Sequence, residues 1–331
     1  MSTQVNNSTG GGENSHNVAI MSYNSTGWTD MKVNFVNILL QAHGILICAL
    51  QEHFILENNL YRINCFQNYE VFSIPAVKNN DVLHRGRPSG GLSIIYHQML
   101  CKVATPLRVP NSSRVQGLKV NLSNSPLLII NSYFPNDPRT VDFDDSVLLQ
   151  TLEDIKYLVN QVDENFTIIM MGDLNADMRR DTTFVNIVKQ FFLEIGVESV
   201  WSSYPCNFTF YHERVQANRT IVSQSIIDHF CVSSHNMNMV MEATPLHIPD
   251  NRSYHDPIYL KLNTSLLFNP SLDTNKCDAS KIHWNRATRE QLAQYKFELS
   301  HFNYDPRHIF HHIFSRTRFE KPIARVGTTH F

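Results

Sequence analysis

Short apolar segments recur along residues 18–262 far more often than helical patterns do, and this imbalance constrains the fold more than any other feature. Most are bounded by Gly, Pro or Asn, as β-strands are. The strands predicted from them are 18–24, 45–50, 69–74, 92–97, 115–122, 127–133, 166–171, 207–211, 226–232, 239–243 and 258–262. Apolar residues at helical spacing predict helices over 29–43, 148–162 and 184–195. Because helices separate the strands only sometimes, two mixed sheets packed face to face with helices outside account for this order better than a fully parallel, doubly wound sheet.

A change of composition divides the chain into three predicted parts. Residues 1–17 are rich in Ser, Thr, Asn and Gly and predict a disordered lead, whereas residues 18–263 hold the strand patterns. Residues 264–331 predict a linker-like tail that is partly helical or disordered, with a weak helical pattern at 286–299. Hydrophobic residues make up 42% of the chain and charged residues 18%, so most of it is globular.

The balance of charges limits how the chain can contact nucleic acid. It has 28 Lys and Arg against 30 Asp and Glu, a net charge of -2, which excludes a polycation that binds by charge alone. Any nucleic-acid contact must therefore be a local patch. The arginines in predicted loops are candidates for phosphate contacts, and solvated surface charge is an equally open interpretation for each: Arg85, Arg87, Arg108, Arg114, Arg179 and Arg180.

Cysteine usage and hydropathy exclude several classes of protein. The six cysteines are scattered without a CxxC pair, which fits a reducing compartment. The N-terminal segment lacks the basic and apolar regions of a secretory signal. The longest apolar runs, such as 44–50, fall far short of the roughly 18 residues that a membrane-spanning helix needs. We therefore expect a protein that is not secreted and has no membrane contact.

Polar residues follow the apolar segments at several strand ends. These sets are Asn24, Gln51-Glu52, Asn131-Ser132-Tyr133, Gly172 to Asp177, Asp228, and Ser253 to Pro257 before the final strand. Singly, each has an ordinary structural explanation, because Gly-Asp segments form turns, a strand-end Glu is usually solvated, and a lone His before a proline is mostly structural. Since polar groups at the ends of separate strands converge at one edge of a sandwich, the ordered set instead indicates a functional site.

In their order, these segments resemble the endonuclease/exonuclease/phosphatase superfamily, and within it the apurinic-endonuclease-like domain of non-LTR retrotransposons. The matching segments are Ser22-Tyr23-Asn24, Leu50-Gln51-Glu52-His53, Gly90-Gly91-Leu92-Ser93-Ile94, Asn131-Ser132-Tyr133-Phe134-Pro135, Met171-Gly172-Asp173-Leu174-Asn175, Thr209-Phe210, Ser225-Ile226-Ile227-Asp228 and Ser253-Tyr254-His255-Asp256-Pro257. The resemblance implies an α/β fold of the deoxyribonuclease type, a four-layer αββα sandwich of two mixed β-sheets. It also implies a phosphodiesterase that depends on a divalent metal.

The resemblance implies a metal site and a water-activating pair. Glu52 would be the principal ligand of Mg²⁺, with Mn²⁺ as a substitute, and Asn24 would lie beside it. Hard oxygen ligands of this kind suit Mg²⁺, which binds through one or two carboxylates plus phosphate and water. Asp173 and Asn175 resemble the pair that orients the attacking water and holds a phosphate oxygen. Tyr133 is similar to the family's phosphate-facing phenol.

A histidine and several polar residues complete the implied site. His255 would contact the scissile phosphate as a cation or a base, and Asp228 would hold its other ring nitrogen and raise its pKa. Whether Asp173 or His255 takes the proton is open at this stage. Thr209 and Ser225 match subsidiary polar positions near the substrate backbone, and Arg179 is the arginine we expect to bind substrate.

The chain departs from the family at one position. It reads Ser253-Tyr254-His255 where the family usually reads Ser-Asp-His, so a carboxylate that normally supports the metal region is lost. Two outcomes are open: Asp256 substitutes imperfectly, or the activity is reduced, as in a decayed transposon copy.

The function that the resemblance implies is that of a retrotransposon DNA endonuclease, which nicks one strand to leave a 3′-hydroxyl primer. We expect the protein to be a monomer. We expect it in the nucleus, or in the cytoplasm before import. The segment 281–285 looks like the linker that leads toward reverse transcriptase in such elements. One alternative is a catalytically impaired nucleic-acid-binding pseudoenzyme, for which Tyr254 is the best evidence. Another is a phosphatase or deadenylase of the same superfamily, because fold alone does not separate these activities.

Overall fold

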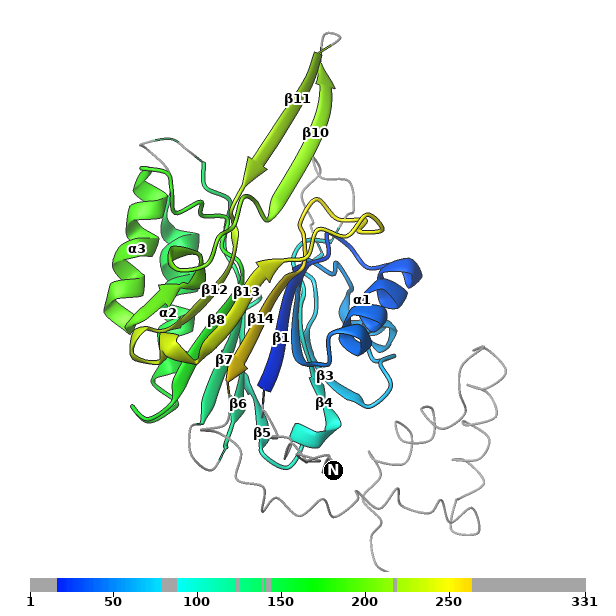
Figure 1. Cartoon of the computed structure of the whole chain (residues 1–331), viewed down its shortest axis with the longest axis vertical. Helices are drawn as coiled ribbons and strands as arrows, with labels where there is room; N and C mark the ends of the chain where they lie inside the picture. The colour runs from blue at the N-terminus through cyan, green and yellow to red at the C-terminus, as the bar shows by residue number, and fades with distance from the viewer. Residues whose placement is uncertain are drawn as a thin grey trace, which may run out of the picture. The chain divides into compact units, whose positions relative to one another are not determined.

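The computed structural model describes residues 17–78, 88–122, 126–138, 140, 144–216 and 219–263. The predicted lead, apart from its last residue, lies outside these ranges, as do Arg85, Arg87 and the predicted tail 264–331. The strands form two six-stranded sheets and a separate two-stranded ribbon (Figure 1).

The first sheet is mixed. Its strands, in spatial order, are β13 (Val240–Pro245), β14 (Ile258–Asn263), β1 (Asn17–Asn24), β2 (Ile45–Gln51), β4 (Leu92–His97) and β3 (Tyr69–Ile74). Only β1 and β2 run parallel, with Asn24 in register with Gln51, and the other neighbours are antiparallel. The last residues of β1 and β2 therefore lie side by side at one edge.

The second sheet repeats this arrangement. Its strands, in spatial order, are β5 (Ala104–Arg108), β6 (Val115–Val120), β7 (Leu127–Tyr133), β8 (Thr167–Asp173), β12 (Asp228–Ser233) and β9 (Val197–Ser199). Here only β7 and β8 run parallel, with Tyr133 in register with Asp173. Asp228 begins the antiparallel strand β12 and pairs with Asp173. Three polar residues thus end or begin adjacent strands at the same edge.

Three α-helices cover the outer faces of the sheets in the described part of the chain: α1 (Asp30–Ala42), α2 (Ser146–Val159) and α3 (Thr183–Ile195). Side chains that cap the backbone fix where two of them begin, because Thr29 accepts a hydrogen bond from Lys32 N and Thr182 accepts one from Val185 N. Gly196, with φ 67°, ends α3 in the left-handed conformation that favours glycine. Short 3₁₀ segments lie at Glu57–Arg62, Gln98–Leu100, Val200–Ser202 and Ser234–Met239.

Packing places the helices on opposite sides of the two sheets (Figure 1). The apolar face of α1, with Val36 and Leu40, packs on the outer face of the first sheet. The apolar faces of α2 and α3 pack on the outer face of the second sheet, around Leu128 and Met170. A third apolar cluster fills the space between the sheets. The layers run helix, sheet, sheet, helix, so the predicted α/β fold, a four-layer αββα sandwich of two mixed sheets, is confirmed.

The two-stranded ribbon, β10 (Phe210–Gln216) with β11 (Arg219–Ser225), projects away from the sandwich (Figure 1). The sequence predicts a strand at 207–211, and this is wrong in its bounds: β10 begins at Phe210 and continues to Gln216. Thr209 precedes the strand: its backbone N–H donates to the Ser225 carbonyl at 3.0 Å, and its hydroxyl accepts from the backbone N–H groups of Ile227 and Asp228. The helices within the described ranges include none that is both long and apolar enough to cross a membrane.

Candidate active site

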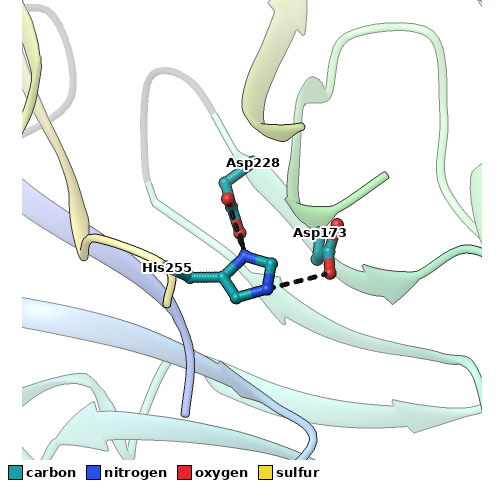
Figure 2. A group of neighbouring side chains, drawn as sticks. All are labelled: Asp173, Asp228 and His255. Carbon is teal, nitrogen blue, oxygen red and sulfur yellow. Dashed lines mark hydrogen bonds and ion pairs between the residues drawn. The ribbon is translucent and has the colours of Figure 1, made fainter. Parts of the chain in front are cut away.

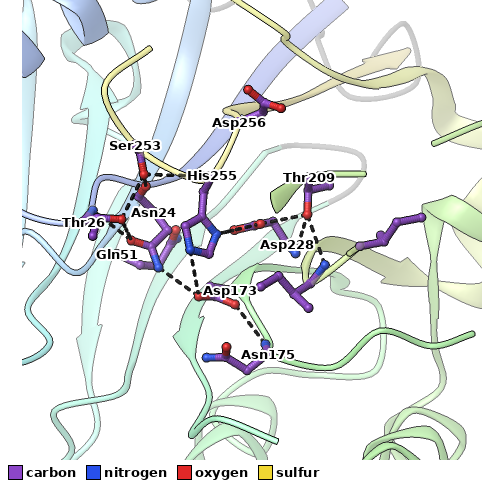
Figure 3. Close-up of polar contacts among 12 residues, drawn as sticks. Asn24, Thr26, Gln51, Asp173, Asn175, Thr209, Asp228, Ser253, His255 and Asp256 are labelled. Atoms are coloured by element: carbon purple, nitrogen blue, oxygen red, sulfur yellow. Dashed lines mark hydrogen bonds and ion pairs between the residues drawn. The ribbon is translucent and has the colours of Figure 1, made fainter. Parts of the chain in front are cut away.

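The polar residues predicted from the strand ends gather at one edge of the sandwich (Figure 3). Asn24 ends β1, and Glu52 directly follows β2, so these two belong to the first sheet. Tyr133 ends β7 and Asp173 ends β8, in the second sheet. His255 reaches the same place from the loop before β14, which an isolated bridge fixes against Phe210.

The core of the site is a histidine between two carboxylates (Figure 2). His255 Nδ1 lies 3.0 and 3.1 Å from the two carboxylate oxygens of Asp228. On the other side of the ring, Nε2 lies 3.9 Å from Asp173 Oδ2. All three residues are buried. Thr209 holds Asp228 in turn, because its hydroxyl donates to Asp228 Oδ2 at 2.8 Å. The contact between Asp228 and His255 that the resemblance implies is therefore present.

The charges of this group decide its protonation. Burial alone lowers the pKa of His255, but the charges of Asp228 and Asp173, together with the hydrogen bond from Asp228, outweigh it and raise the pKa to about 9. Burial raises the pKa of the Asp173 carboxyl, an effect that the charge of Asp228 strengthens and the charge of His255 opposes. At neutral pH His255 is consequently a cation whose Nδ1–H donates to Asp228.

Glu52 joins the two sheets through two neutral donors. The Tyr133 hydroxyl donates to Glu52 Oε1 at 2.8 Å. The side-chain amide of Asn24 donates to Glu52 Oε2 at 3.0 Å and to Asp173 Oδ2 at 2.9 Å. Burial and the charges of Glu52 and Asp173 raise the pKa of Tyr133, so the phenol keeps its proton. Asn24 thus bridges one carboxylate from each sheet.

A glycine fixes the end of β8, one residue before Asp173. Gly172 has φ 145°, and a Cβ there would lie 1.9 Å from the Ser132 carbonyl oxygen, so only glycine lets β7 and β8 approach this closely. Asn175, with φ 49°, donates its backbone N–H to Asp173 Oδ1 at 2.9 Å and its side-chain amide to the Phe134 carbonyl at 2.9 Å. The structure therefore places Asn175 directly beside Asp173.

The loop that carries His255 is tied to the first sheet. Ser253 Oγ donates to the Asn24 carbonyl at 2.7 Å. The Tyr254 side chain is 53% exposed, and its ring stands perpendicular to the His212 ring with centroids 4.6 Å apart. Asp256 lies apart from the buried group (Figure 3) and accepts hydrogen bonds from His247 at 2.7 Å and Asn251 at 3.2 Å. Its carboxylate is thus engaged by His247 and Asn251.

Of the three predicted substrate-binding residues, Thr209 bonds Asp228 of the buried group, whereas Ser225 and Arg179 bond other residues. Ser225 is buried at the end of β11, where its carbonyl accepts from Thr209 N at 3.0 Å. Arg179 forms a two-point ion pair with Asp177, with nitrogen to oxygen distances of 2.7 and 2.8 Å. By contrast, Arg114 lies over the Tyr133 ring at 5.1 Å and donates to the Tyr133 carbonyl at 3.2 Å.

Two contributors to the site were not predicted from the sequence. Thr26, with φ 45°, donates its backbone N–H to Asn24 Oδ1 at 3.0 Å. Lys32, buried in the first turn of α1, donates to the carbonyls of Ser25 and Thr26 and so fixes the turn after Asn24. No sequence pattern marks either residue, because a lysine in a helix is usually exposed to solvent and a threonine in a turn is common.

Two sets of donor atoms are suited to a metal ion. One ligand atom from each of Asp173, Asp228 and His255 lies within 4.8 Å of the others, so this buried group is close enough to hold an ion. Its histidine is already engaged between the two carboxylates, however. Glu52 supplies carboxylate oxygens, the donors that hard cations such as Mg²⁺ prefer, while Asn24 turns its amide nitrogen toward Glu52 and its Oδ1 toward Thr26 N. The residues present fit a hard divalent cation at Glu52.

Comparison with known structures supports the fold. The AP endonuclease LMAP from Leishmania major is 15% identical, with a TM-score of 0.58 over 75% of this chain and 88% of that one. The endonuclease domain of TRAS1, a telomere-specific non-LTR retrotransposon, is 13% identical, with a TM-score of 0.53 over 74% of this chain and 98% of that one. The 3′ phosphatase NExo from Neisseria, bound to a product DNA hairpin, is 16% identical, with a TM-score of 0.53 over 74% and 99%.

These likenesses define the class of fold. No protein-family model matches the sequence, and no curated protein matches it significantly. The chain has the fold of the endonuclease/exonuclease/phosphatase superfamily, in the form found in AP endonucleases. One of these structural neighbours, the TRAS1 endonuclease domain, comes from a non-LTR retrotransposon, the group that the sequence resembles.

Proposed function

We propose that this protein is a phosphodiesterase dependent on a divalent metal, and specifically a DNA endonuclease that nicks one strand and leaves a 3′-hydroxyl. One observation carries the proposal: three carboxylates, an amide, a phenol and a cationic histidine from six separate segments meet at one edge of the sandwich. These residues are Asn24, Glu52, Tyr133, Asp173, Asp228 and His255.

Each residue has a role that its contacts support. Glu52 would hold Mg²⁺, with Asn24 beside it donating its amide N–H to the Glu52 carboxylate. The bound ion would neutralise charge on the phosphoryl oxygens. His255 stays protonated at neutral pH beside Asp228, so it is the cation that contacts the scissile phosphate. A protonated imidazole cannot accept a proton, which leaves Asp173 as the base for the attacking water. Asn175 holds Asp173 Oδ1 through its backbone N–H and so orients that carboxylate.

The substrate assignment rests on relatives and on the sequence. The structural neighbours are named as AP endonucleases, a retrotransposon endonuclease domain and a 3′ phosphatase. The segment order resembles the retrotransposon group, so we assign the protein to that group as a monomeric nuclease acting on nuclear DNA, with residues 18–263 as the nuclease domain. Arg179, the arginine predicted to bind substrate, is paired with Asp177, so we propose instead that Arg114, which lies over the Tyr133 ring, contacts a phosphate beside the site.

The experiment that tests this function is the nicking of supercoiled plasmid. We expect conversion to open circles with Mg²⁺ or Mn²⁺, and none with chelator, because oxygen donors at Glu52 select hard cations over zinc. The nicked product should support extension by a DNA polymerase without prior phosphatase treatment, as a 3′-hydroxyl requires. Full activity in chelator, or activity that needs Zn²⁺, contradicts the assignment. Release of phosphate from a 3′-phosphorylated oligonucleotide, or shortening of poly(A), without plasmid nicking would favour the phosphatase or deadenylase alternative.

The Tyr254 departure gives a second prediction. Replacing Tyr254 with aspartate adds a negative charge in the residue next to His255, where the family carries a carboxylate. One charge roughly 7 Å from a divalent cation in water is worth about 1 kcal/mol, so we expect the Mg²⁺ concentration for half-maximal nicking to fall about threefold to tenfold. Tyr254→Asn, which removes the ring without adding charge, is the matched control and should leave the Mg²⁺ requirement unchanged.

The same titration separates nuclease from pseudoenzyme. An inactive parent together with an inactive Tyr254→Asp protein would favour the impaired binding protein, because the missing carboxylate would then not be what limits the site. An active parent with an unchanged Mg²⁺ requirement would show that this position has no part in binding the ion.

A further inference from the structure

The two halves of the site stand on different sheets. Asn24 and Glu52 belong to the first sheet, whereas Tyr133 and Asp173 belong to the second. Two hydrogen bonds join them, from Tyr133 to Glu52 at 2.8 Å and from Asn24 to Asp173 at 2.9 Å. The geometry of the site therefore depends on how the two sheets are positioned against each other.

Directly beneath the site, the contact between the sheets is polar. Five polar side chains, all 0–1% exposed, face one another there, and we name them the amide cluster: Ser22, Gln51, Ser93, Gln116 and Asn131. The rest of this sheet interface is apolar, with residues such as Ile47 and Ile129. Buried polar groups are costly unless they are hydrogen-bonded, so this cluster is a specific arrangement rather than general packing.

Hydrogen bonds within the amide cluster run from sheet to sheet. Gln51 Nε2 donates to Asn131 Oδ1 at 2.8 Å and to Ser22 Oγ at 3.0 Å. Asn131 Nδ2 donates to the carbonyls of Leu50 at 3.0 Å and Ser93 at 3.1 Å. Asn131 of the second sheet is thus bonded to three residues of the first.

A third amide strengthens this connection. With its side-chain oxygen directed toward β4, Gln116 accepts from the backbone N–H of Ser93 at 3.1 Å and of Ile94 at 3.0 Å. Gln116 is also in register with Asn131 across β6 and β7. Side chains of two adjacent strands in the second sheet therefore bond the same stretch of β4 in the first.

Hydrogen bonds and apolar contacts constrain such an interface differently. Apolar contacts are not directional, so apolar faces alone tolerate small shifts, whereas hydrogen bonds between buried amides have a set length and direction. Any shift is passed directly to the site, because Gln51 precedes Glu52 in the chain and Asn131 lies two residues before Tyr133 on the same side of β7.

We propose that Gln51 and Asn131 are positioning residues, whose hydrogen bond fixes the separation of the two sheets beneath the site and so holds Glu52 beside Tyr133 and Asp173. This inference rests on the proposed nuclease function. A misplacement on the order of 1 Å can cost about 100-fold in rate, which sets the size of the expected effect.

The test uses the full chain and removes the hydrogen bond without adding charge. Gln51→Met keeps the length of the side chain but cannot donate to Asn131. We expect kcat for plasmid nicking to fall about 10- to 100-fold with little change in KM for DNA, and the Kd for Mn²⁺ without DNA, measured by calorimetry, to rise about tenfold. Asn131→Leu should have a similar effect, and the double variant should be no worse than the poorer single one, since both remove the same bond.

Thr167→Val is the matched control. Thr167, which is buried, starts β8 at the end opposite Asp173 and accepts a part-buried hydrogen bond from Asn236 at 2.6 Å. Its loss should lower Tm but leave kcat and the Kd for Mn²⁺ unchanged, because the bond is remote from the site. If Gln51→Met behaves like this control, with lower Tm and both constants within about twofold of the parent, the positioning role is wrong.

Nicking activity and Mn²⁺ binding test the proposed function and the positioning role separately. A parent protein that binds Mn²⁺ but does not nick DNA overturns the proposed function, whereas the Kd for Mn²⁺ of the variants still decides the positioning role. A parent that binds no Mn²⁺ overturns both, since Glu52 would then hold no cation to be positioned.

Discussion

Replacing Glu52 with glutamine is expected to reduce Mg²⁺-dependent nicking by about 100- to 1,000-fold and to abolish measurable Mn²⁺ binding. The substitution removes the negative charge that a hard divalent cation requires. It also directs an amide group at one of the two donors that now face the carboxylate, the Tyr133 hydroxyl and the Asn24 amide. Removal of one preorganised electrostatic group from an active site typically costs about this factor.

The measurement is the initial rate of plasmid nicking against Mg²⁺ concentration, with calorimetry of Mn²⁺ binding alongside. Glu164→Gln is the matched control, because Glu164 is exposed in the loop before β8, at the end of that strand opposite Asp173. It should behave like the parent protein. If Glu52→Gln keeps more than about a tenth of the parental rate at the same Mg²⁺ concentration, Glu52 is not the principal ligand.

The parts of the fold that bury apolar faces were predictable from the sequence. The strands β2, β4 and β7 are almost wholly buried, so their apolar runs stand out, and their predicted bounds agree with the structure to within one residue. The same burial explains why residues at the strand ends converge, because the apolar run determines where each strand leaves the core.

Strands without a buried face were missed. The strand β11 pairs only with β10, and most of its side chains are exposed, so no alternation of polar and apolar residues marks it. The strand β5 lies at a sheet edge and contains Pro106, a residue that argues against a central strand. Apolar patterns in a sequence indicate which side chains are buried, and β5 and β11 have few buried side chains.

Contacts between polar side chains were predictable only through the family resemblance. Nothing in the spacing of Asp228 and His255 shows that they touch, and nothing marks Asp256 as the partner of His247. The amide cluster could not be predicted from the sequence for the same reason, since Gln51 and Asn131 are each, taken alone, an ordinary amide near the end of a strand. Hydrogen-bond partners depend on which strands are neighbours, and that information lies in the topology.

The second large effect is expected from the pair formed by Asp228 and His255. His255→Ala and Asp228→Asn should each reduce nicking about 100- to 1,000-fold, and the double variant should be no slower than the slower single one. Both carboxylate oxygens of Asp228 lie within 3.1 Å of His255 Nδ1, so the two side chains act as one unit. Effects of residues that act as a unit do not add, whereas additive losses would show that the two are not partners.

The pH profile shows why the pair matters. The charges of Asp228 and Asp173 raise the pKa of His255 to about 9, so the cation is present at neutral pH and is lost as the pH rises through that value. In Asp228→Asn the nearer charge is gone while burial still lowers the pKa, so the alkaline limb should move down by roughly one pH unit or more. Part of the lost activity should then return as the pH falls through the lowered pKa of His255, until protonation of Asp173, whose pKa burial raises, removes the base. His255→Ala should show no such recovery, because it has no ring to protonate.

Asp256→Asn is the matched control for this pair. It makes the same substitution in a neighbouring aspartate that accepts a 2.7 Å hydrogen bond from His247, outside the buried group. Its nicking rate should stay within about threefold of the parent, with no shift of the alkaline limb. If Asp228→Asn keeps the parental pH profile while losing activity, Asp228 acts by some means other than holding the charge on His255. In that case His255 itself, rather than Asp173, becomes the candidate for the base that activates water, because a neutral ring can accept a proton.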